Sequence, residues 1–268
     1  LLAGLWANGE TSVTEPEPTR DHTERMLRAF GYEVKTEGNR ISLPGGGKLV
    51  ATEIQVPSDI SSAAFFMVGA AITEGSDVTL EAVGINPTRT GVIEILKQMG
   101  ADLTVENERI AGGEPIADIR IRGTRTLKGI HMPEDQVPLA IDEFPALFIA
   151  AACAEGRTIL TGAAELRVKE SDRIQVMADG LETMGIDCTP TDDGIIIEGK
   201  GKSGDWSAVF SGGEIESHHD HRIAMSFSMA GLRTSGEIKI IGTETVATSF
   251  PTFTELANQA GLAIQVSE

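Results

Sequence analysis

The sequence predicts an α/β fold of repeated β-α-β-α-β-β units, with buried central helices and outer mixed sheets. Three observations predict it: a repeated helix–glycine–strand pattern, a second glycine–strand block that precedes each copy, and three helices that lack a polar face. Internal repeats at a regular spacing are typical of folds in which one supersecondary unit recurs. We expect one full domain and part of another.

The first pattern is a helical run that ends at glycine and continues into an alternating strand. Its four copies are LRAFGYEV at Leu27–Val34, LKQMGADLTV at Leu96–Val105, LETMGIDCT at Leu181–Thr189 and LANQAGLAIQV at Leu256–Val266. Glycine after the last helical turn readily takes the left-handed conformation that ends a helix. Each copy therefore predicts an amphipathic helix followed by a strand.

The second block has small residues, a polar position, glycine and a strand. Its copies are LWANGETSV, AITEGSDVTL, CAEGRTIL and LRTSGEIKII, and its glycine precedes the helix-ending glycine by 22, 25, 29 and 25 residues. One unit therefore contains an apolar helix, a strand, an amphipathic helix and two further strands. This order implies a mixed sheet with helices packed on it.

The first helix of each complete unit is apolar nearly all round. The three examples follow Asp59, Asp142 and Asp220. A helix without a polar face must be buried on every side, so we expect the three to cluster at the centre with the sheets outside. Asp is a favoured N-cap residue, whose carboxylate accepts hydrogen bonds from first-turn amides, and a plain N-cap explains Asp59 well.

The register of the repeats places a domain boundary near Val56–Pro57. Residues 1–56 are expected to be a remnant of an amino-terminal domain, the end of its last repeat unit. Residues 57–268 are expected to form a carboxy-terminal domain of three units, the last of which ends at its final helix and one strand. The start of the sequence inside an apolar run suggests a fragment.

The charge balance excludes some classes of partner. Lys and Arg number 22 and Asp and Glu number 40, which gives a net charge of −18. Such a chain is repelled by phosphodiester backbones and by anionic lipid, so we expect neither nucleic acid nor membrane as a partner. The sequence has two cysteines and no long apolar run, so it predicts no disulfide framework and favours a cytoplasmic location.

Asp142 and Glu143 form a doubled acid ahead of a buried helix. A carboxylate held partly out of water can have its pKa raised and act as a base, so Asp142 is a candidate catalytic residue. The alternative is that Asp142 is a plain N-cap. Both interpretations stay open from the residues alone.

Basic residues gather where helices are expected to begin. Arg167–Arg173 opens an amphipathic helix, on which Lys169 and Arg173 would share one face with Glu170 alongside. Arg222 opens an apolar helix, and Arg20 and Arg89 precede amphipathic ones. Helix starts favour anions, so these positions indicate an anionic ligand, with ordinary surface ion pairs as the alternative. The run His218–His221 is better explained by a capping Asp220 than by a metal site.

Three motifs together resemble the EPSP synthase (3-phosphoshikimate 1-carboxyvinyltransferase) family: RVKESDR at Arg167–Arg173, DHRIAM at Asp220–Met225 and the helix after Asp142. PTRDHTERML at Pro18–Leu27 and ATSFPTF at Ala247–Phe253 fit the same family. The resemblance implies two domains of three units each. It also implies transfer of the enolpyruvyl group of phosphoenolpyruvate to the 5-hydroxyl of shikimate 3-phosphate, with release of phosphate, in the shikimate pathway that leads to chorismate. No metal or organic cofactor is implied.

The resemblance also implies roles for individual residues. Asp142 matches the carboxylate that takes the proton of the shikimate 5-hydroxyl, and Glu170 matches the acid that transfers a proton at the phosphoenolpyruvate methylene. Lys169 matches the lysine that contacts shikimate 3-phosphate and the reacting centre. Arg173 and Arg222 match arginines that bind phosphoenolpyruvate. Arg20 is similar to the arginine that binds the shikimate phosphate in one branch of the family.

Two departures from the family pattern affect the expected activity. Thr248 stands where some members carry lysine, and the amino-terminal Lys-Ser-x-x-x-x-Arg, Gly-Thr and Ser-x-Gln motifs are absent from these residues. The chain alone is therefore expected to be inactive, with the missing amino-terminal half of the protein as its partner. Two other functions remain as alternatives: an enolpyruvyl transferase acting on UDP-N-acetylglucosamine, and a non-catalytic repeat module that binds an anion.

Overall fold

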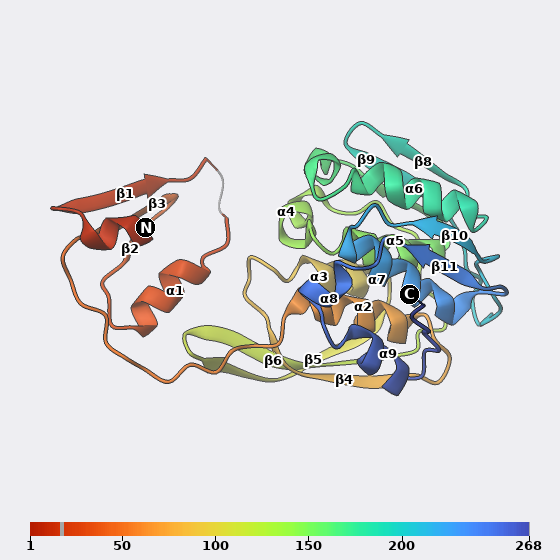
Figure 1. The fold of residues 1–268 in the computed structure, drawn as a ribbon, viewed down its shortest axis with the longest axis horizontal. Helices are drawn as coiled ribbons and strands as arrows, with labels where there is room; N and C mark the ends of the chain where they lie inside the picture. The colour runs from red at the N-terminus through yellow and green to blue at the C-terminus, as the bar shows by residue number, and fades with distance from the viewer. Residues whose placement is uncertain (17–18, 268) are drawn as a thin grey trace.

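The computed structural model describes residues 1–16 and 19–267, so Pro18, the first residue of the PTRDHTERML motif, lies outside the described residues. The amino-terminal segment lies to one side of a larger body (Figure 1). Its elements are η1 (Leu2–Trp6), β1 (Glu10–Thr14), α1 (His22–Ala29), β2 (Lys35–Glu37) and β3 (Arg40–Pro44). The strands form an antiparallel sheet in the order β1-β3-β2.

The segment has an apolar core of its own. This core consists of Leu5, Leu27, Tyr32, Val34, Ile41 and Leu43. All other buried apolar side chains that the structure groups together belong to the larger body, which begins at α2. The two parts therefore have separate cores.

The larger body repeats one arrangement of helices and strands. The first unit contains α2 (Ile60–Ala71), β4 (Asp77–Gly84), α3 (Gly91–Gln98), β5 (Asp102–Ala111) and β6 (Glu114–Arg122). The second contains η2 (Glu134–Gln136), α4 (Val137–Ala140), α5 (Phe144–Ala152), β7 (Glu155–Leu160), η3 (Ala164–Val168), α6 (Arg173–Thr183), β8 (Cys188–Thr191) and β9 (Gly194–Lys200). The third contains β10 (Gly213–Glu216), α7 (His221–Ala230), η4 (Gly231–Arg233), β11 (Ile238–Ile241), α8 (Val246–Ser249) and α9 (Phe253–Gln259).

The sheets of the three units are mixed, as the repeats predict. Strands β4-β6-β5 and β7-β9-β8 pair antiparallel in that order, whereas β10 and β11 pair parallel. In the first two units the strand before the apolar helix is reduced to isolated parallel bridges, such as Ser58 with Val83 and His131 with Ile159. The predicted α/β fold of repeated units is confirmed.

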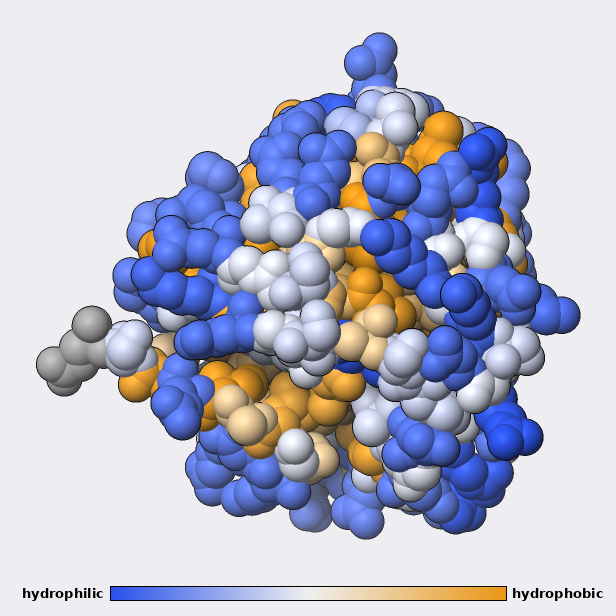
Figure 2. Space-filling view, turned by 90° about the vertical axis from the view of Figure 1, so that its right-hand side faces the viewer, coloured by the Kyte–Doolittle hydropathy of each residue, from blue (hydrophilic) through white to orange (hydrophobic). Residues whose placement is uncertain are grey.

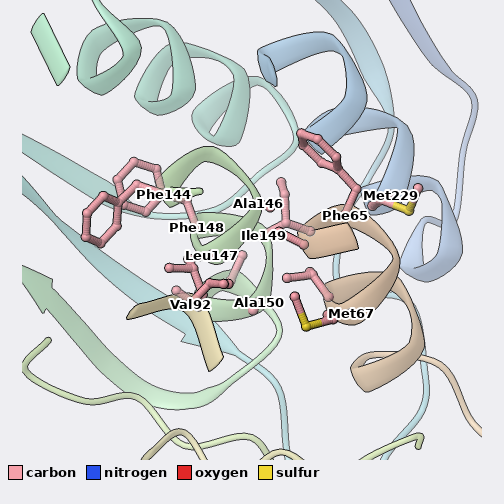
Figure 3. Close-up of a cluster of buried hydrophobic side chains, with 14 of the residues drawn as sticks. Phe65, Met67, Val92, Phe144, Ala146, Leu147, Phe148, Ile149, Ala150 and Met229 are labelled. Carbon is pink, nitrogen blue, oxygen red and sulfur yellow. The ribbon is translucent and has the colours of Figure 1, made fainter. Parts of the chain in front are cut away.

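The three apolar helices α2, α5 and α7 form the centre of the body. Every residue of α5 is buried. Figure 3 shows Phe65 of α2 and Met229 of α7 on the side of α5 that carries Ala146 and Ile149, with Phe144 and Phe148 on the other side. Complete burial of this helix stabilises the fold because each of its Phe, Leu and Ile side chains contributes about 1.5–3 kcal/mol when it leaves water. The expected cluster of central helices is confirmed.

Helix α6 packs very closely on α7. A Cβ atom added at Gly180 would lie 2.3 Å from Cζ of Phe227, so no larger residue fits without movement. Helix α6 begins at Arg173, so this contact also fixes where its first turn lies relative to the first turn of α7.

The helix-ending glycines behave as predicted, because Gly31, Gly100, Gly185 and Gly261 all have positive φ. The strand expected after Gly261 is wrong, since the structure describes none between Leu262 and Ser267. The side chain of Asn258 accepts a hydrogen bond from the backbone N–H of Ile264 at 2.8 Å and donates one to its carbonyl at 3.0 Å. These bonds satisfy the backbone groups that a strand would pair.

Hydrophilic side chains predominate on the face seen in Figure 2, around smaller apolar areas. Among the described residues, no helix is long and apolar enough to cross a membrane.

Candidate active site

Asp142 lies in the short link between α4 and α5, with a side chain that is 14% exposed. Of the two alternatives for Asp142, the plain N-cap of α5 is wrong, because Glu143 occupies that position, without a capping hydrogen bond. Asp59 and Asp220 do cap α2 and α7, and their side chains accept hydrogen bonds from first-turn amides. The Asp142 carboxylate is therefore available for other contacts.

Four cationic side chains surround the Asp142 carboxylate. Arg20 Nη2 lies 2.5 Å from Oδ2, Lys169 Nζ 3.5 Å from Oδ1, Arg173 Nη1 3.6 Å from Oδ1, and Arg222 Nη2 3.9 Å from Oδ2. They come from the residues before α1, the link after η3, and the first turns of α6 and α7. Four of the 22 Lys and Arg side chains thus converge on one carboxylate, and such a group of cations can bind an anion.

The cations control the ionisation of Asp142. Burial alone would raise the pKa of this carboxyl group, but the hydrogen bond from Arg20 and the charges of Arg222 and Lys169 outweigh burial. The pKa of Asp142 is therefore held well below its ordinary value. Asp142 is a carboxylate at neutral pH, able to accept a proton but weakly basic while all its cations remain in place.

Lys169 lies in the candidate site, but on a different backbone segment from the one expected. The prediction that Lys169 and Arg173 share a helix face is wrong, because α6 begins at Arg173 and Lys169 is extended backbone after η3. Asp172 caps α6 and pairs with Arg167 at 2.6 Å, which holds the turn between the two segments. Lys169 still reaches Asp142, and it also pairs with Glu165.

Arg173 is the most deeply buried cation of the site, with a side chain that is 1% exposed. Its Nε donates to Asp220 Oδ2 at 2.8 Å, and its Nη2 donates to Glu170. Burial tends to raise the pKa of Asp220, but the hydrogen bond and charge of Arg173 lower it below its ordinary value. Asp220 thus remains ionised, caps α7 and aligns Arg173.

Arg173 Nη1 is a buried donor that has no hydrogen-bond partner among the described residues. It faces Asp142 Oδ1 at 3.6 Å, too far for a hydrogen bond. A buried donor left unpaired costs about 1–3 kcal/mol, so this atom favours a ligand that brings an acceptor. Glu170 stands beside it with a side chain that is 52% exposed, free to meet a ligand from solvent.

The structure gives less support to cysteine or metal chemistry. Burial raises the pKa of both Cys153 and Cys188 to about 12, so neither is a thiolate at neutral pH. Within residues 1–16 and 19–267, no group of three or more His, Cys, Asp or Glu side chains could hold a metal ion. His219 instead pairs with Glu244 at 3.1 Å.

A family model described as EPSP synthase (3-phosphoshikimate 1-carboxyvinyltransferase) matches residues 1–256. The chain belongs to the EPSP synthase family. It is 65% identical over 267 residues to the 3-phosphoshikimate 1-carboxyvinyltransferase of Methylococcus capsulatus, and 62% identical over 265 residues to that of Nitrosococcus oceani. These alignments cover 100% and 99% of this chain, but 59% and 58% of those relatives.

Solved structures agree with the family. EPSP synthase from Acinetobacter baumannii matches with a TM-score of 0.98 at 90% identity, covering 100% of this chain and 60% of that one. The enolpyruvyl transferase NikO from Streptomyces tendae matches with a TM-score of 0.77 at 18% identity over 98% of this chain and 58% of that one, which shows the shared fold. The chain spans about 60% of the length of its EPSP synthase relatives.

The structure brings together all six site residues that the sequence analysis named, namely Arg20, Asp142, Lys169, Glu170, Arg173 and Arg222. It also places Ser61 and Arg89 beside Glu143, directly behind Asp142. The sequence alone indicates no role for Ser61. A serine in the first turn of an otherwise apolar helix was the available signal.

Proposed function

We propose that this chain is the carboxy-terminal part of an enzyme that transfers the enolpyruvyl group of phosphoenolpyruvate to the 5-hydroxyl of shikimate 3-phosphate and releases phosphate. In this proposal residues 1–56 belong to an amino-terminal domain and residues 57–268 form the carboxy-terminal domain. The separate core of the amino-terminal segment supports this division. The substrates would bind between the two domains, where Arg20 meets Asp142.

The observation that carries the proposal is the unpartnered Arg173 Nη1 inside a group of four cations around one carboxylate. Both proposed substrates are polyanions, and guanidinium groups bind phosphate and carboxylate through paired hydrogen bonds. In the proposed complex Arg173 and Arg222 bind phosphoenolpyruvate, while Arg20 binds the phosphate of shikimate 3-phosphate. Lys169 contacts shikimate 3-phosphate and the reacting centre.

In the first step the 5-oxygen of shikimate 3-phosphate forms a bond to C2 of phosphoenolpyruvate and gives its proton to Asp142. The electron pair of the C2–C3 double bond takes a proton at C3 from Glu170, and a tetrahedral intermediate results. In the second step the C2–O bond to phosphate breaks and the departing phosphate takes up the proton that Asp142 received. Glu170 takes a proton back from C3, which restores the double bond and returns both carboxyl groups to their starting states. Fixed cations stabilise the charged groups throughout.

The Arg20–Asp142 ion pair implies that shikimate 3-phosphate itself prepares the base. When Arg20 transfers to the substrate phosphate, Asp142 loses the hydrogen bond that contributes most to lowering its pKa. The pKa of Asp142 then rises toward the range in which a carboxylate is an effective general base. Binding of the acceptor thereby precedes and enables proton removal.

Acceptor dependence tests the proposed function. The 268-residue chain would be compared with the same chain joined to the amino-terminal part of the Acinetobacter baumannii enzyme, whose corresponding region is 90% identical. We expect phosphate release from phosphoenolpyruvate only by the joined protein and only with shikimate 3-phosphate. Phosphate release with UDP-N-acetylglucosamine instead would favour an enolpyruvyl transferase acting on that acceptor. No phosphate release by the joined protein with either acceptor would favour a non-catalytic module that binds an anion.

A further inference from the structure

Glu143 is a buried acid to which the proposed reaction gives no role. Its side chain is 1% exposed, although it adjoins the candidate base Asp142. It occupies the N-cap position of α5 without a capping hydrogen bond, so it does not serve to start the helix. A buried carboxylate is costly unless charges or hydrogen bonds compensate it, so the groups that contact Glu143 indicate what it does.

Glu143 lies between two guanidinium groups. Its Oε1 accepts a hydrogen bond from Ser61 Oγ and lies 3.6 Å from Arg89 Nη2 and 3.8 Å from Arg222 Nη1. Arg89 in turn donates to Ser61 Oγ at 2.6 Å and lies 3.7 Å from Asp59. The first turns of α2 and α7, the start of α5 and the turn that precedes α3 therefore meet at one carboxylate.

Of the residues that contact Glu143, Arg222 also belongs to the candidate active site. Arg222 Nη1 donates to the backbone carbonyl of Asp142 at 3.0 Å and faces Glu143, whereas Nη2 faces the Asp142 carboxylate. A guanidinium group is planar and rigid, so the contacts that hold Nη1 against the Asp142 carbonyl and Glu143 also fix the direction of Nη2. Burial raises the pKa of Glu143, whereas the hydrogen bond from Ser61 and the charges of Arg222 and Arg89 favour its ionised form.

We propose that Glu143 is a positioning residue that holds the Arg222 guanidinium in the orientation required to bind phosphoenolpyruvate, with Ser61 and Arg89 as its supports. This inference rests on the proposed function, in which Arg222 binds that substrate. Glu143 does not touch the substrate and takes no proton from it. Its effect therefore falls on phosphoenolpyruvate and leaves shikimate 3-phosphate, bound through Arg20 and Lys169, nearly unaffected.

The test uses Glu143→Gln in the joined protein described above. Glutamine keeps the shape and can still accept the hydrogen bond from Ser61, but it removes the charge between Arg89 and Arg222. We expect KM for phosphoenolpyruvate to rise about ten-fold or more, since the half-buried Arg222 guanidinium loses one of its two counter-charges, while KM for shikimate 3-phosphate changes less than about two-fold. The matched control is Glu198→Gln, which removes the exposed pair with Arg157 and should change neither KM.

An unchanged KM for phosphoenolpyruvate would overturn the proposal, as would an equal rise in both KM values, which indicates a merely structural role. If Glu143→Gln does not fold, Ser61→Ala removes the hydrogen bond to Glu143 and is expected to give the same selective effect, about three-fold. Equal KM values for Ser61→Ala and the unmodified protein would then contradict the proposal.

A second measurement separates this inference from the proposed function. The nitrogen NMR signals of the Arg222 guanidinium group report its hydrogen bonding whether or not the protein turns over. We expect Glu143→Gln to shift these signals and to speed rotation of the group, and Glu198→Gln to leave them in place. If the unmodified joined protein released no phosphate but these signals moved as expected, the proposed function would fail and the positioning of Arg222 would stand.

Discussion

Arg20 and Asp142 form an ion pair at 2.5 Å although 122 positions separate them in the chain. It joins the amino-terminal segment to the larger body at the centre of the candidate active site. The pair exists because α1 begins beside the loop that precedes α3. Asn86 of that loop is 2% exposed and donates to Asp21 Oδ1 at 2.6 Å and to Glu114 Oε2 at 3.0 Å.

Asn86→Ala should therefore loosen the segment that carries Arg20. The variant leaves Asp21 and Glu114 without their shared donor, while the His22–Glu114 contact at 2.8 Å and the Arg20–Asp142 pair remain. We expect KM for shikimate 3-phosphate in the joined protein to rise about ten-fold, with KM for phosphoenolpyruvate nearly unchanged. Steady-state kinetics with each substrate varied in turn would measure this.

The control is Asn8→Ala, since Asn8 is an exposed asparagine of the same segment. A normal KM for shikimate 3-phosphate in Asn86→Ala would show that the loop does not position Arg20.

Asp142→Asn should remove the proposed base while keeping its size and its backbone contact with Arg222. We expect kcat to fall by about 10²–10⁴-fold, the usual contribution of a positioned general base. Single-turnover phosphate release would measure the chemical step directly. Asp102→Asn, which removes an exposed pair with Arg122 at 3.2 Å, is the matched control and should retain normal turnover. Turnover by Asp142→Asn within a few-fold of the unmodified rate would exclude Asp142 as the base.

Asp220→Asn should reveal the buried ion pair through the pH dependence of stability. The pKa of Asp220 is lowered in the folded chain, so its contribution is fully present above the ordinary Asp value, about 3.9, and is lost as pH falls through the lower folded value. At pH 7 we expect the free energy of unfolding to drop by about 3–5 kcal/mol, because Arg173 stays buried without its carboxylate.

Urea unfolding at pH 7 and at decreasing pH would test this prediction. The difference between the unmodified chain and Asp220→Asn should be constant down to about pH 4 and shrink below it. Asp187→Asn, at an exposed position, is the control. A difference that grew as the pH fell would have the wrong sign for a lowered pKa.

Gly180→Ala tests the close packing of α6 on α7. The added Cβ would lie 2.3 Å from the Phe227 ring, so the helices must separate, and we expect a loss of about 1–3 kcal/mol in the free energy of unfolding. Gly231→Ala is the matched control, because nothing lies within 4 Å of its added Cβ. Thermal unfolding would measure both, and equal stability of Gly180→Ala and the unmodified chain would contradict the packing described.

The sequence predicted the central helices because a helix that is buried on every side has almost no charged residues, and α2, α5 and α7 show this composition. It predicted the helix-ending glycines for a similar local reason. The sequence did not predict the loss of the last strand. The Asn258 side chain forms hydrogen bonds with the backbone of Ile264, and the alternation of apolar and polar residues does not reveal such bonds. Nor did the sequence place Lys169 correctly, because the cap at Asp172 interrupts a spacing that otherwise suits a helix.

For the candidate site too, local sequence features were predictable and contacts between distant residues were not. The cations at helix starts and the doubled acid at Asp142 were visible in sequence, and they do converge. The shared burial of Glu143 between Arg89 and Arg222 was not visible, because these residues come from three different units of the repeat. Contacts of this kind arise only when the starts of the central helices are brought together.

The most direct test of the account is a crystal structure of the joined protein with shikimate 3-phosphate and phosphoenolpyruvate bound. We predict that Arg173 Nη1 donates a hydrogen bond to an anionic oxygen of phosphoenolpyruvate, and that Arg20 has left Asp142 to bind the shikimate phosphate. Both substrates bound elsewhere, with the Arg20–Asp142 pair intact and Arg173 Nη1 still unpartnered, would contradict the account.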